Sequence, residues 1–323
     1  MCTSIIIKQK DMYFGRNLDL ECSFGEKVVI TPRDYPFTFH NKESISHHYA
    51  MIGMATVVDN YPLYAEAMNE KGLAMAGLNF PGNAHYFEWN ENKNNITPFE
   101  FIPYLLSQYA TIQEVKEVLK TIQLLDVPFK KEMPLAPLHW MITDGKESII
   151  VESMQDGLHV YEDKYGVLTN NPPYEYHVWN VQNYLHMTPM YPENKMSKHV
   201  DINPYGNGFG SIGLPGDCSP ASRFVRAFYV KDNSIFTDDE EENITQFFHI
   251  LDAVSMVKGS VLTPQGKVDY TTYSCGMNLS KGWYYYKTYE NNQLTCIKMK
   301  ERDLGTKKLY TYELQKKQQV AIQ

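Results

Sequence analysis

The chain opens with Met1-Cys2-Thr3-Ser4-Ile5-Ile6-Ile7, the stretch on which the rest of the interpretation depends. Its apolar run predicts a strand over residues 2–8. Removal of Met1 would leave Cys2 with a thiol and a free α-amino group. The thiolate is the reactive form of cysteine, and an α-amine with a pKa of about 7.7–8.0 can take a proton near neutral pH. Cys2 could thus supply nucleophile and base together, although position alone favours an accident of the start site.

Residues 11–17 predict a second strand that returns through a turn at Gln9-Lys10. The end of this strand carries Arg16 and Asp19. If the two strands pair as a hairpin, both side chains approach the N-terminus. A carboxylate there could hold the α-amine, and an arginine could favour the thiolate and fix the carboxylate. A surface salt bridge at a strand end is the alternative.

Three further polar residues follow predicted strands or open a helix. Asn79 ends a strand predicted over 73–79, and Asn170 follows one predicted over 166–169. Either amide could donate to a developing oxyanion, although turn geometry also explains an Asn before proline. Arg223 falls in the first turn of a helix that begins at Ser219-Pro220. A cation there opposes the helix dipole, so we expect an anionic partner, either Asp217 or a substrate group.

The remaining pattern predicts an α+β fold in one domain, residues 1–323. Strands are expected over 50–58, 138–143, 148–152, 158–161, 270–279, 283–289 and 293–299. Capping-box patterns at Thr97 and Thr111 predict two helix starts, and a further helix is expected over 241–257. Blocks of strands alternate with pairs of helices, which favours sheets between helical layers over a βαβ alternation.

Composition excludes several classes of protein. The net charge of −8 argues against a nucleic-acid surface. We expect neither a membrane span nor a signal peptide, because no apolar run approaches about 18 residues and no basic segment precedes an apolar one. The five cysteines are widely spaced, which fits neither a disulfide framework nor a zinc site and favours a cytoplasmic location. The ten histidines show no ligand spacing, so no metal is expected.

Eight motifs in order carry a resemblance to a known family. They are Met-Cys-Thr at the start, FGRNLD (14–19), NEKGLAMAGLNF (69–80), PLHWMITD (137–144), GVLTNNP (166–172), GLPGD-x-SPASRF (213–224), FFHIL (247–251) and KGWYYYKTYEN (281–291). With these motifs the chain resembles the choloylglycine hydrolase family of N-terminal-nucleophile hydrolases, which includes bile salt hydrolases and penicillin V acylases. The resemblance covers nearly the whole chain.

The resemblance implies a four-layer αββα sandwich and amide hydrolysis in two steps, without a cofactor. After loss of Met1, the Cys2 thiol would be the nucleophile and its own amine the base. The other residues that match the family are Arg16 and Asp19, which would orient and charge-tune Cys2, Asn79 and Asn170, which would lie near the oxyanion, and Arg223, which would support the thiolate. The family also implies a homo-oligomer, expected to be a homotetramer.

Asn79 resembles the bile salt hydrolases, because penicillin V acylases tend to carry an aromatic residue there. The expected substrate is therefore a small molecule, a bile acid conjugated to glycine or taurine. A steroid needs a broad apolar pocket. The candidates for its lining are Leu18, Leu20, Phe24, Tyr61, Leu63, Ala65, Met133 and Leu135.

Three alternatives remain open from the sequence. The first is a sibling acylase that acts on penicillin V or another N-acyl amide. The second is a papain-like hydrolase with His139 as base, although no CGSCW-like context surrounds Cys2. The third is a non-enzymatic thiol sensor or binding protein, whose function would survive Cys2→Ser.

Overall fold

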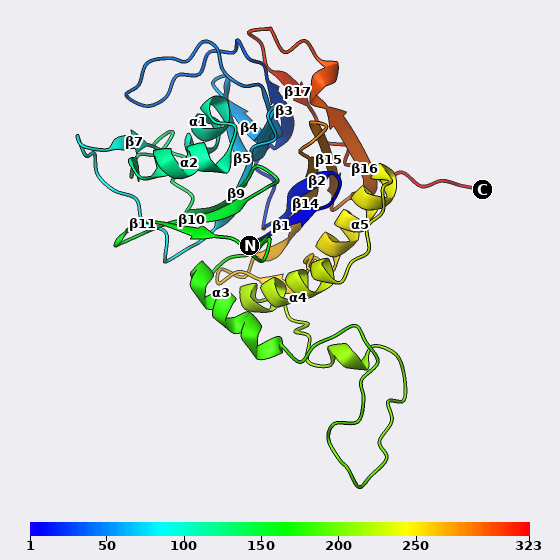
Figure 1. Cartoon of the computed structure of the whole chain (residues 1–323). Helices are drawn as coiled ribbons and strands as arrows, with labels where there is room; N and C mark the ends of the chain where they lie inside the picture. The colour runs from blue at the N-terminus through cyan, green and yellow to red at the C-terminus, as the bar shows by residue number, and fades with distance from the viewer.

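The computed structural model describes residues 1–323 and has two antiparallel sheets packed face to face, with helices on both outer faces (Figure 1). The first sheet has the order β12-β1-β2-β14-β15-β16, with β13 paired to β14. Its strands are β1 (Cys2–Lys8), β2 (Met12–Leu20), β12 (Val167–Leu168), β13 (Val261–Leu262), β14 (Val268–Asn278), β15 (Trp283–Thr288) and β16 (Asn291–Lys298). The hairpin predicted at the N-terminus is therefore the centre of this sheet.

The second sheet has the order β11-β10-β9-β6-β5-β4-β3-β17. Its strands are β3 (Lys27–Thr31), β4 (Met51–Val58), β5 (Tyr61–Asn69), β6 (Ala74–Asn79), β9 (Leu138–Thr143), β10 (Ser148–Met154), β11 (Gly157–Glu162) and β17 (Tyr310–Tyr312). Two short strands, β7 (Asn94–Ile96) and β8 (Ile122–Leu124), pair in parallel outside it.

Helices α1 (Phe101–Gln108) and α2 (Ile112–Leu119) cover the second sheet, and α3 (Tyr174–Val181), α4 (Pro220–Asp232) and α5 (Glu240–Asp252) lie against the first (Figure 1). Short 3₁₀ turns occupy Gln182–Tyr184, Phe209–Ser211 and Met299–Glu301. The layers run helix, sheet, sheet, helix, so the predicted αββα sandwich is confirmed. No helix combines the length and apolar character needed to cross a membrane.

The apolar side chains form two cores. One contains Cys2 and Phe14 from the first sheet, Met68 from the second, and Phe247 from α5. The other lies between the second sheet and its helices and includes Trp140. Because side chains alternate along a strand, the first sheet must present apolar residues on both faces. This explains why β1 reads as a continuous apolar run rather than an alternating one.

Six strands were not predicted from the sequence, namely β3, β5, β7, β8, β13 and β17. The two longest of them are Lys27–Thr31 and Tyr61–Asn69, and the second contains Pro62. Proline argues against a central strand because it lacks an N–H donor. Pro62 is tolerated because β5 pairs with β6 only from Glu66 to Met68, which leaves its first half as an edge on that side.

Several helix boundaries also differ from prediction. The capping box at Thr111 is formed as expected. At Thr97, however, the hydroxyl binds Glu100 at 2.6 Å within a turn, and α1 begins only at Phe101. Helix α5 ends at Asp252 instead of 257. Helix α3 was not predicted.

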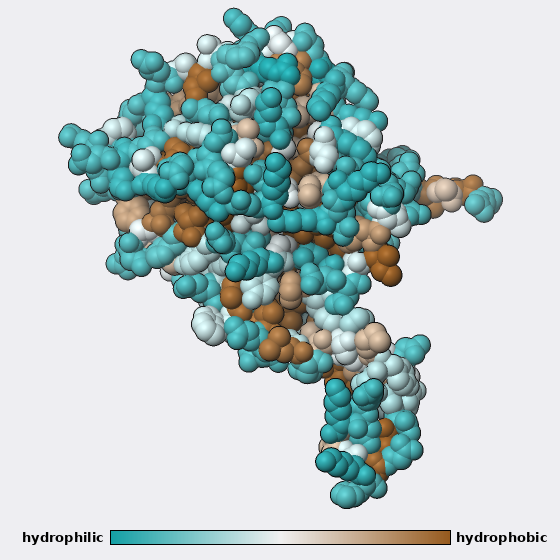
Figure 2. Space-filling model, viewed as in Figure 1, coloured by the Kyte–Doolittle hydropathy of each residue, from teal (hydrophilic) through white to brown (hydrophobic).

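Residues 182–219, here called the arm, extend away from the body of the molecule between α3 and α4 (Figure 1). Figure 2 shows brown hydrophobic residues among the teal ones along this extension. The C-terminal tail also runs outward (Figure 1).

Candidate active site

Because successive side chains of a strand point to opposite faces of the sheet, the site residues divide between the two faces of the first sheet. Cys2 pairs with Leu18 and Ser4 with Arg16, so Cys2 and Arg16 project on the same face, toward the second sheet. Thr3, Asn17 and Asp19 project on the other face, toward the helices. The Asn17 amide confirms this direction, because it donates to the carbonyl of Leu251 on α5 at 2.7 Å.

On the face between the sheets, Arg16 contacts the sulfur of Cys2. Its Nη2 donates to Cys2 Sγ, and its Nη1 donates to the carbonyl of Gly77 on β6 at 2.6 Å. Cys2 is only 3% exposed, and Arg16 is fully buried. Burial lowers the pKa of Arg16, but Cys2, Tyr273 and Glu66 outweigh it and raise this pKa above its usual value. A buried, permanently positive group therefore lies against the Cys2 sulfur.

On the helical face, Arg223 holds the backbone of Cys2. Its Nη1 donates to the carbonyl of Cys2 at 2.5 Å and to Thr3 Oγ1 at 2.7 Å. Its Nη2 donates to Asn170 Oδ1 at 2.7 Å, and its Nε donates to the carbonyl of Cys218 at 2.9 Å. Burial lowers the pKa of Arg223. All these hydrogen bonds are to uncharged oxygens.

This arrangement corrects one expectation about Arg223 and makes another more specific. Asp217 is not its partner, because that carboxylate accepts from the Ser219 N–H at 2.9 Å and the Ser222 hydroxyl at 2.6 Å at the start of α4. Arg223 also makes no hydrogen bond to the sulfur, which is contacted by Arg16. Arg223 holds the main chain of the nucleophile and Asn170, and its charge acts on Cys2 without a hydrogen bond to the sulfur.

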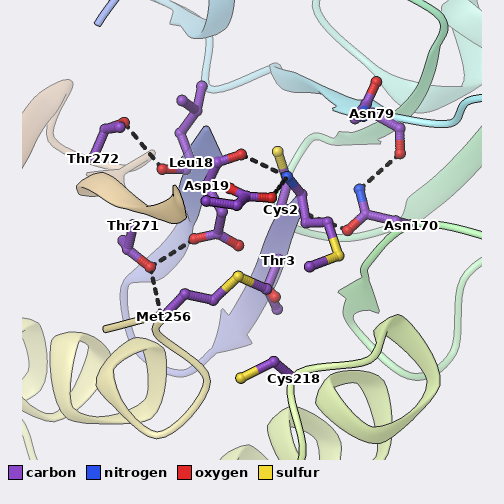
Figure 3. A network of polar contacts seen from close by, with 12 residues as sticks. Cys2, Thr3, Leu18, Asp19, Asn79, Asn170, Cys218, Met256, Thr271 and Thr272 are labelled. Atoms are coloured by element: carbon purple, nitrogen blue, oxygen red, sulfur yellow. Dashed lines mark hydrogen bonds and ion pairs between the residues drawn. The ribbon is translucent and has the colours of Figure 1, made fainter. Parts of the chain in front are cut away.

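Asn170 links the backbone of Cys2 to Asn79. Its Oδ1 accepts from the Cys2 N–H at 2.9 Å, and its Nδ2 donates to the carbonyl of Asn79 at 2.7 Å (Figure 3). One amide hydrogen of Asn170 is thus already used. The Asn79 side chain makes no hydrogen bond within the chain, and it lies at the end of β6. Of the two predicted oxyanion donors, Asn79 has its amide free.

Asp19 lies on the helical face near the N-terminus (Figure 3). Its Oδ1 accepts from Thr271 Oγ1 at 2.6 Å, while its Oδ2 is buried without a partner. Burial raises the pKa of Asp19, against the opposing effect of Arg223. The Met1 amine donates to the main-chain carbonyl of Asp19 at 2.6 Å and to Asp269 Oδ2 at 3.3 Å. One carboxylate, that of Asp269, therefore binds the Met1 amine, and Asp19 contacts this amine only through its main chain.

The sequence analysis missed Glu66, Asp269 and Thr271. Glu66 lies on β5, fully buried, with Oε2 3.6 Å from Arg16 Nη1. In the sequence, Glu66 is the single carboxylate in the largely apolar segment YPLYAEAMN. A buried role for it can be inferred only if this segment is known to be a strand. Asp269 and Thr271 lie at the start of β14, far away in sequence, and no local pattern connects them to Cys2.

His139 does not serve Cys2. Its Nδ1 lies 2.9 Å from Glu152 Oε1, its Nε2 lies 3.0 Å from the carbonyl oxygen of Thr169, and its ring stacks on Phe80 at 4.3 Å. Both ring nitrogens are engaged, so the papain-like Cys–His alternative is excluded by the geometry. His139 instead supports the strand that leads to Asn170.

The candidate pocket residues separate into two groups. Leu63, Met133 and Leu135 line one apolar cavity of about 170 Å³, together with Leu138, which pairs with Asn79 across β6 and β9. Tyr61 packs on Phe129, another residue of this lining. The second group contacts the core between the sheets and consists of Leu18, Leu20, Phe24 and Ala65.

A sandwich of two sheets between helices, with a cysteine at the start of a central strand, defines an N-terminal-nucleophile hydrolase fold. The sequence model of the linear amide C–N hydrolases, choloylglycine hydrolase family, matches residues 2–312. The chain belongs to this family and is a hydrolase of C–N bonds in linear amides.

Curated relatives extend over the full chain. A bile salt hydrolase/transferase from Lactiplantibacillus plantarum is 46% identical over 319 residues, covering 99% of this chain and 98% of the relative. One from Clostridium perfringens is 41% identical, covering 98% of each. A solved structure of a cysteine-to-alanine mutant of the C. perfringens conjugated bile acid hydrolase superposes with a TM-score of 0.93 at 39% identity, covering 100% of this chain and 99% of that chain. Penicillin V acylase from Agrobacterium tumefaciens, with a TM-score of 0.75, 19% identity and coverage of 96% and 90%, shares the fold.

Proposed function

We propose that this hydrolase cleaves the amide bond between a bile acid and glycine or taurine, with Cys2 as nucleophile. The chemistry rests on one observation, that Arg16 holds the Cys2 sulfur while Asn170 and Arg223 hold its main chain. The substrate class rests on the names of relatives that are 36–46% identical over nearly the whole chain. The Asn at position 79, where penicillin V acylases tend to carry an aromatic residue, supports the same substrate class.

The proposed reaction starts once Met1 has been removed. The Cys2 sulfur attacks the amide carbonyl, and its proton passes to the α-amine. The nitrogen of this amine is the Cys2 main-chain nitrogen, which in the chain that retains Met1 donates as a peptide N–H to Asn170 Oδ1. The Asn79 amide donates to the tetrahedral oxyanion. The C–N bond then breaks, and glycine or taurine leaves with the proton from the α-ammonium. Water, deprotonated by the same amine, hydrolyses the thioester and regenerates the thiol. No cofactor takes part.

For the steroid we propose the apolar cavity beside Asn79. Its volume of about 170 Å³ lies below the roughly 300–1,000 Å³ usual for ligand pockets, so the surrounding loops must move apart on binding. A salt bridge between Asp59 and Lys130, 2.6 Å long, joins the loop before β5 to the loop that carries Met133. This exposed contact is where we expect the cavity to open.

The test is release of glycine and taurine from glycocholate and taurocholate, with penicillin V assayed alongside and Cys2→Ala as control. Rapid release that depends on Cys2, with weak turnover of penicillin V, is the expected result. Fast cleavage of penicillin V with inert bile salts would overturn the substrate and favour the sibling acylase. No turnover by protein shown by intact mass to lack Met1 would overturn the proposal in favour of another linear amide.

We further propose a cytoplasmic homotetramer. The cytoplasmic location is supported by the five cysteines, all of which are free thiols. Assembly is supported by the arm, which leaves large apolar side chains in solvent. They are Leu185, Met190, Tyr191, Met196, Val200, Ile202, Tyr205 and Ile212.

A further inference from the structure

A buried carboxylate lies behind the arginine that contacts the nucleophile. Arg16 projects from β2 in the first sheet, and Glu66 projects from β5 in the second. The Arg16 guanidinium contacts both Cys2 and Glu66. Its Nη2 donates to Cys2 Sγ, and its Nη1 lies 3.6 Å from Glu66 Oε2. Arg16 therefore has two possible anionic partners, the Glu66 carboxylate and a Cys2 thiolate. The charge on one partner must affect the other.

The groups around Glu66 match its ionised form. The Tyr273 hydroxyl donates to both carboxylate oxygens, at 3.1 and 2.9 Å, and the Tyr284 hydroxyl donates to Oε1 at 2.7 Å. Burial raises the pKa of Glu66 above its usual value, and Arg16 and the two tyrosines offset part of this rise by stabilising the charged form. Each of these neighbours offers hydrogens, and a carboxylate is an acceptor only.

The contribution of the Arg16–Glu66 ion pair to folding stability does not explain why the pair is present. Removing a guanidinium and a carboxylate from water costs more than their attraction returns in many proteins, and an apolar pair of the same volume is often as stable. Arg16 is also held by the carbonyl of Gly77 at 2.6 Å, so it does not need Glu66 to remain ordered. The distinctive effect of Glu66 is therefore its negative charge beside the only cation on the sulfur.

We infer that Glu66 is a positioning residue for the hydrolysis: it acts as counter-ion to Arg16, so that Cys2 remains a thiol able to pass its proton to the α-amine. This inference rests on the proposed role of Cys2 as nucleophile. Without Glu66, the thiolate would be the sole anionic partner of a buried guanidinium. Such a pair would lower the thiol pKa, and the nucleophilicity of a thiolate falls as its pKa falls.

Other charged and titratable groups face this pair and must be kept constant in a test. Around Cys2 they are the N-terminal amine, Asp19, Arg223 and Asp269, and around Glu66 they are Tyr273, Cys275 and Tyr284. Of these, Tyr273 and Cys275 also act on Arg16.

The experiment is alkylation of Cys2 by iodoacetamide as a function of pH, in protein lacking Met1, read by mass spectrometry of the N-terminal peptide. In Glu66→Gln, which keeps the shape and removes the charge, we expect the pH midpoint to fall by about one unit. The kcat for glycocholate is expected to fall about threefold, in line with the weaker nucleophile. An unchanged midpoint, or one that rises, would overturn the inference. Because alkylation uses no bile salt, a wrong substrate would leave this result intact.

Glu240 provides a matched control. It is a second carboxylate surrounded by donors, accepting from Tyr13 at 2.7 Å, Tyr285 at 3.0 Å and Lys281 at 2.9 Å, and it makes no contact with Arg16. Glu240→Gln is expected to leave the midpoint of Cys2 unchanged, and an equal shift in both variants would contradict a specific role for Glu66.

A second variant covers the case in which Glu66→Gln does not fold. Tyr284→Phe removes one hydrogen bond that stabilises the charged form of Glu66. It should lower the midpoint in the same direction by a smaller amount, whereas Tyr13→Phe beside Glu240 should not. Equal midpoints in these two variants would overturn the inference.

Discussion

Asn79 is the residue whose substitution best separates chemistry from stability. Its side-chain amide makes no hydrogen bond in the protein, although its main-chain carbonyl accepts from Asn170 at 2.7 Å. Asn79→Ala should therefore lower kcat by about 10²–10³, the usual cost of one oxyanion donor. The midpoint of thermal unfolding should stay within a degree or two of the unmodified protein.

Asn170→Ala is the comparison for this prediction. The Asn170 amide forms hydrogen bonds with Cys2, Arg223 and Asn79. The Asn170→Ala variant should therefore lose both activity and stability. Steady-state kinetics gives the kcat of the two variants, and calorimetry gives their midpoints of thermal unfolding. Equal destabilisation of both would mean that Asn79 has a structural role.

Arg16 allows activity and stability to be separated in another way. Arg16→Met removes the cation from the sulfur and leaves Glu66 buried without its counter-ion, which costs about 3–5 kcal/mol. The double variant Arg16→Met with Glu66→Gln removes both charges and should recover most of this loss in urea unfolding. It should not recover hydrolysis, because the sulfur still lacks its partner. Recovery of activity would show that Arg16 acts only through packing.

At the scale of elements, the N-terminal hairpin was predictable because its information is local. A short turn fixes the register of β1 and β2, and the register places Cys2 and Arg16 on one face. The role of Glu66 could not be predicted from the sequence, because it depends on β5 of the second sheet facing β2 of the first. The same limit applies to Arg223, whose partners are carbonyl and amide oxygens contributed by β1 and by Asn170, more than fifty residues away.

Helix α3 contributes a pH-sensitive support to the site. His177 on this helix is fully buried, its Nε2 lies 2.9 Å from the main-chain oxygen of Asn170, and burial lowers its pKa from 6.5 to about 4. The unfolded chain binds this proton more readily, so the stabilisation is complete above pH 6.5 and is lost as the pH falls toward 4. The full effect corresponds to about 3 kcal/mol.

His177→Gln keeps a donor for the Asn170 carbonyl and removes the titration. The free energy of unfolding in urea should fall less between pH 7 and pH 4.5 in this variant than in the unmodified protein. His139→Gln is not a suitable control, because that ring is paired with Glu152. His199, whose exposed ring makes no hydrogen bond within the chain, is suitable, and His199→Gln should leave the pH dependence unchanged. Identical slopes for His177→Gln and the unmodified protein would refute the role of α3.

At the scale of the whole molecule, we propose that residues 1–323 form one domain to which the arm adds an assembly surface. The two cores share the second sheet, whose strands contribute to both. The arm belongs to neither core. Its most exposed apolar side chains, Met196 at 91% and Tyr205 at 95%, cost free energy in water at about 25 cal/mol per Å². A monomer would gain nothing from them, whereas a neighbouring copy could bury them.

The variant Met196→Ser with Tyr205→Ser therefore tests assembly directly. We expect the unmodified protein to be a tetramer by light scattering after size exclusion, and the variant to shift toward dimer or monomer at the same concentration. Ile235→Ser, which removes an equally exposed apolar side chain outside the arm, should leave the mass unchanged. Activity per Cys2 should persist in the smaller species, because Arg16, Asn170 and Arg223, which hold Cys2, belong to the same chain as Cys2. A monomeric unmodified protein, or a variant that remains tetrameric, would contradict assembly through the arm.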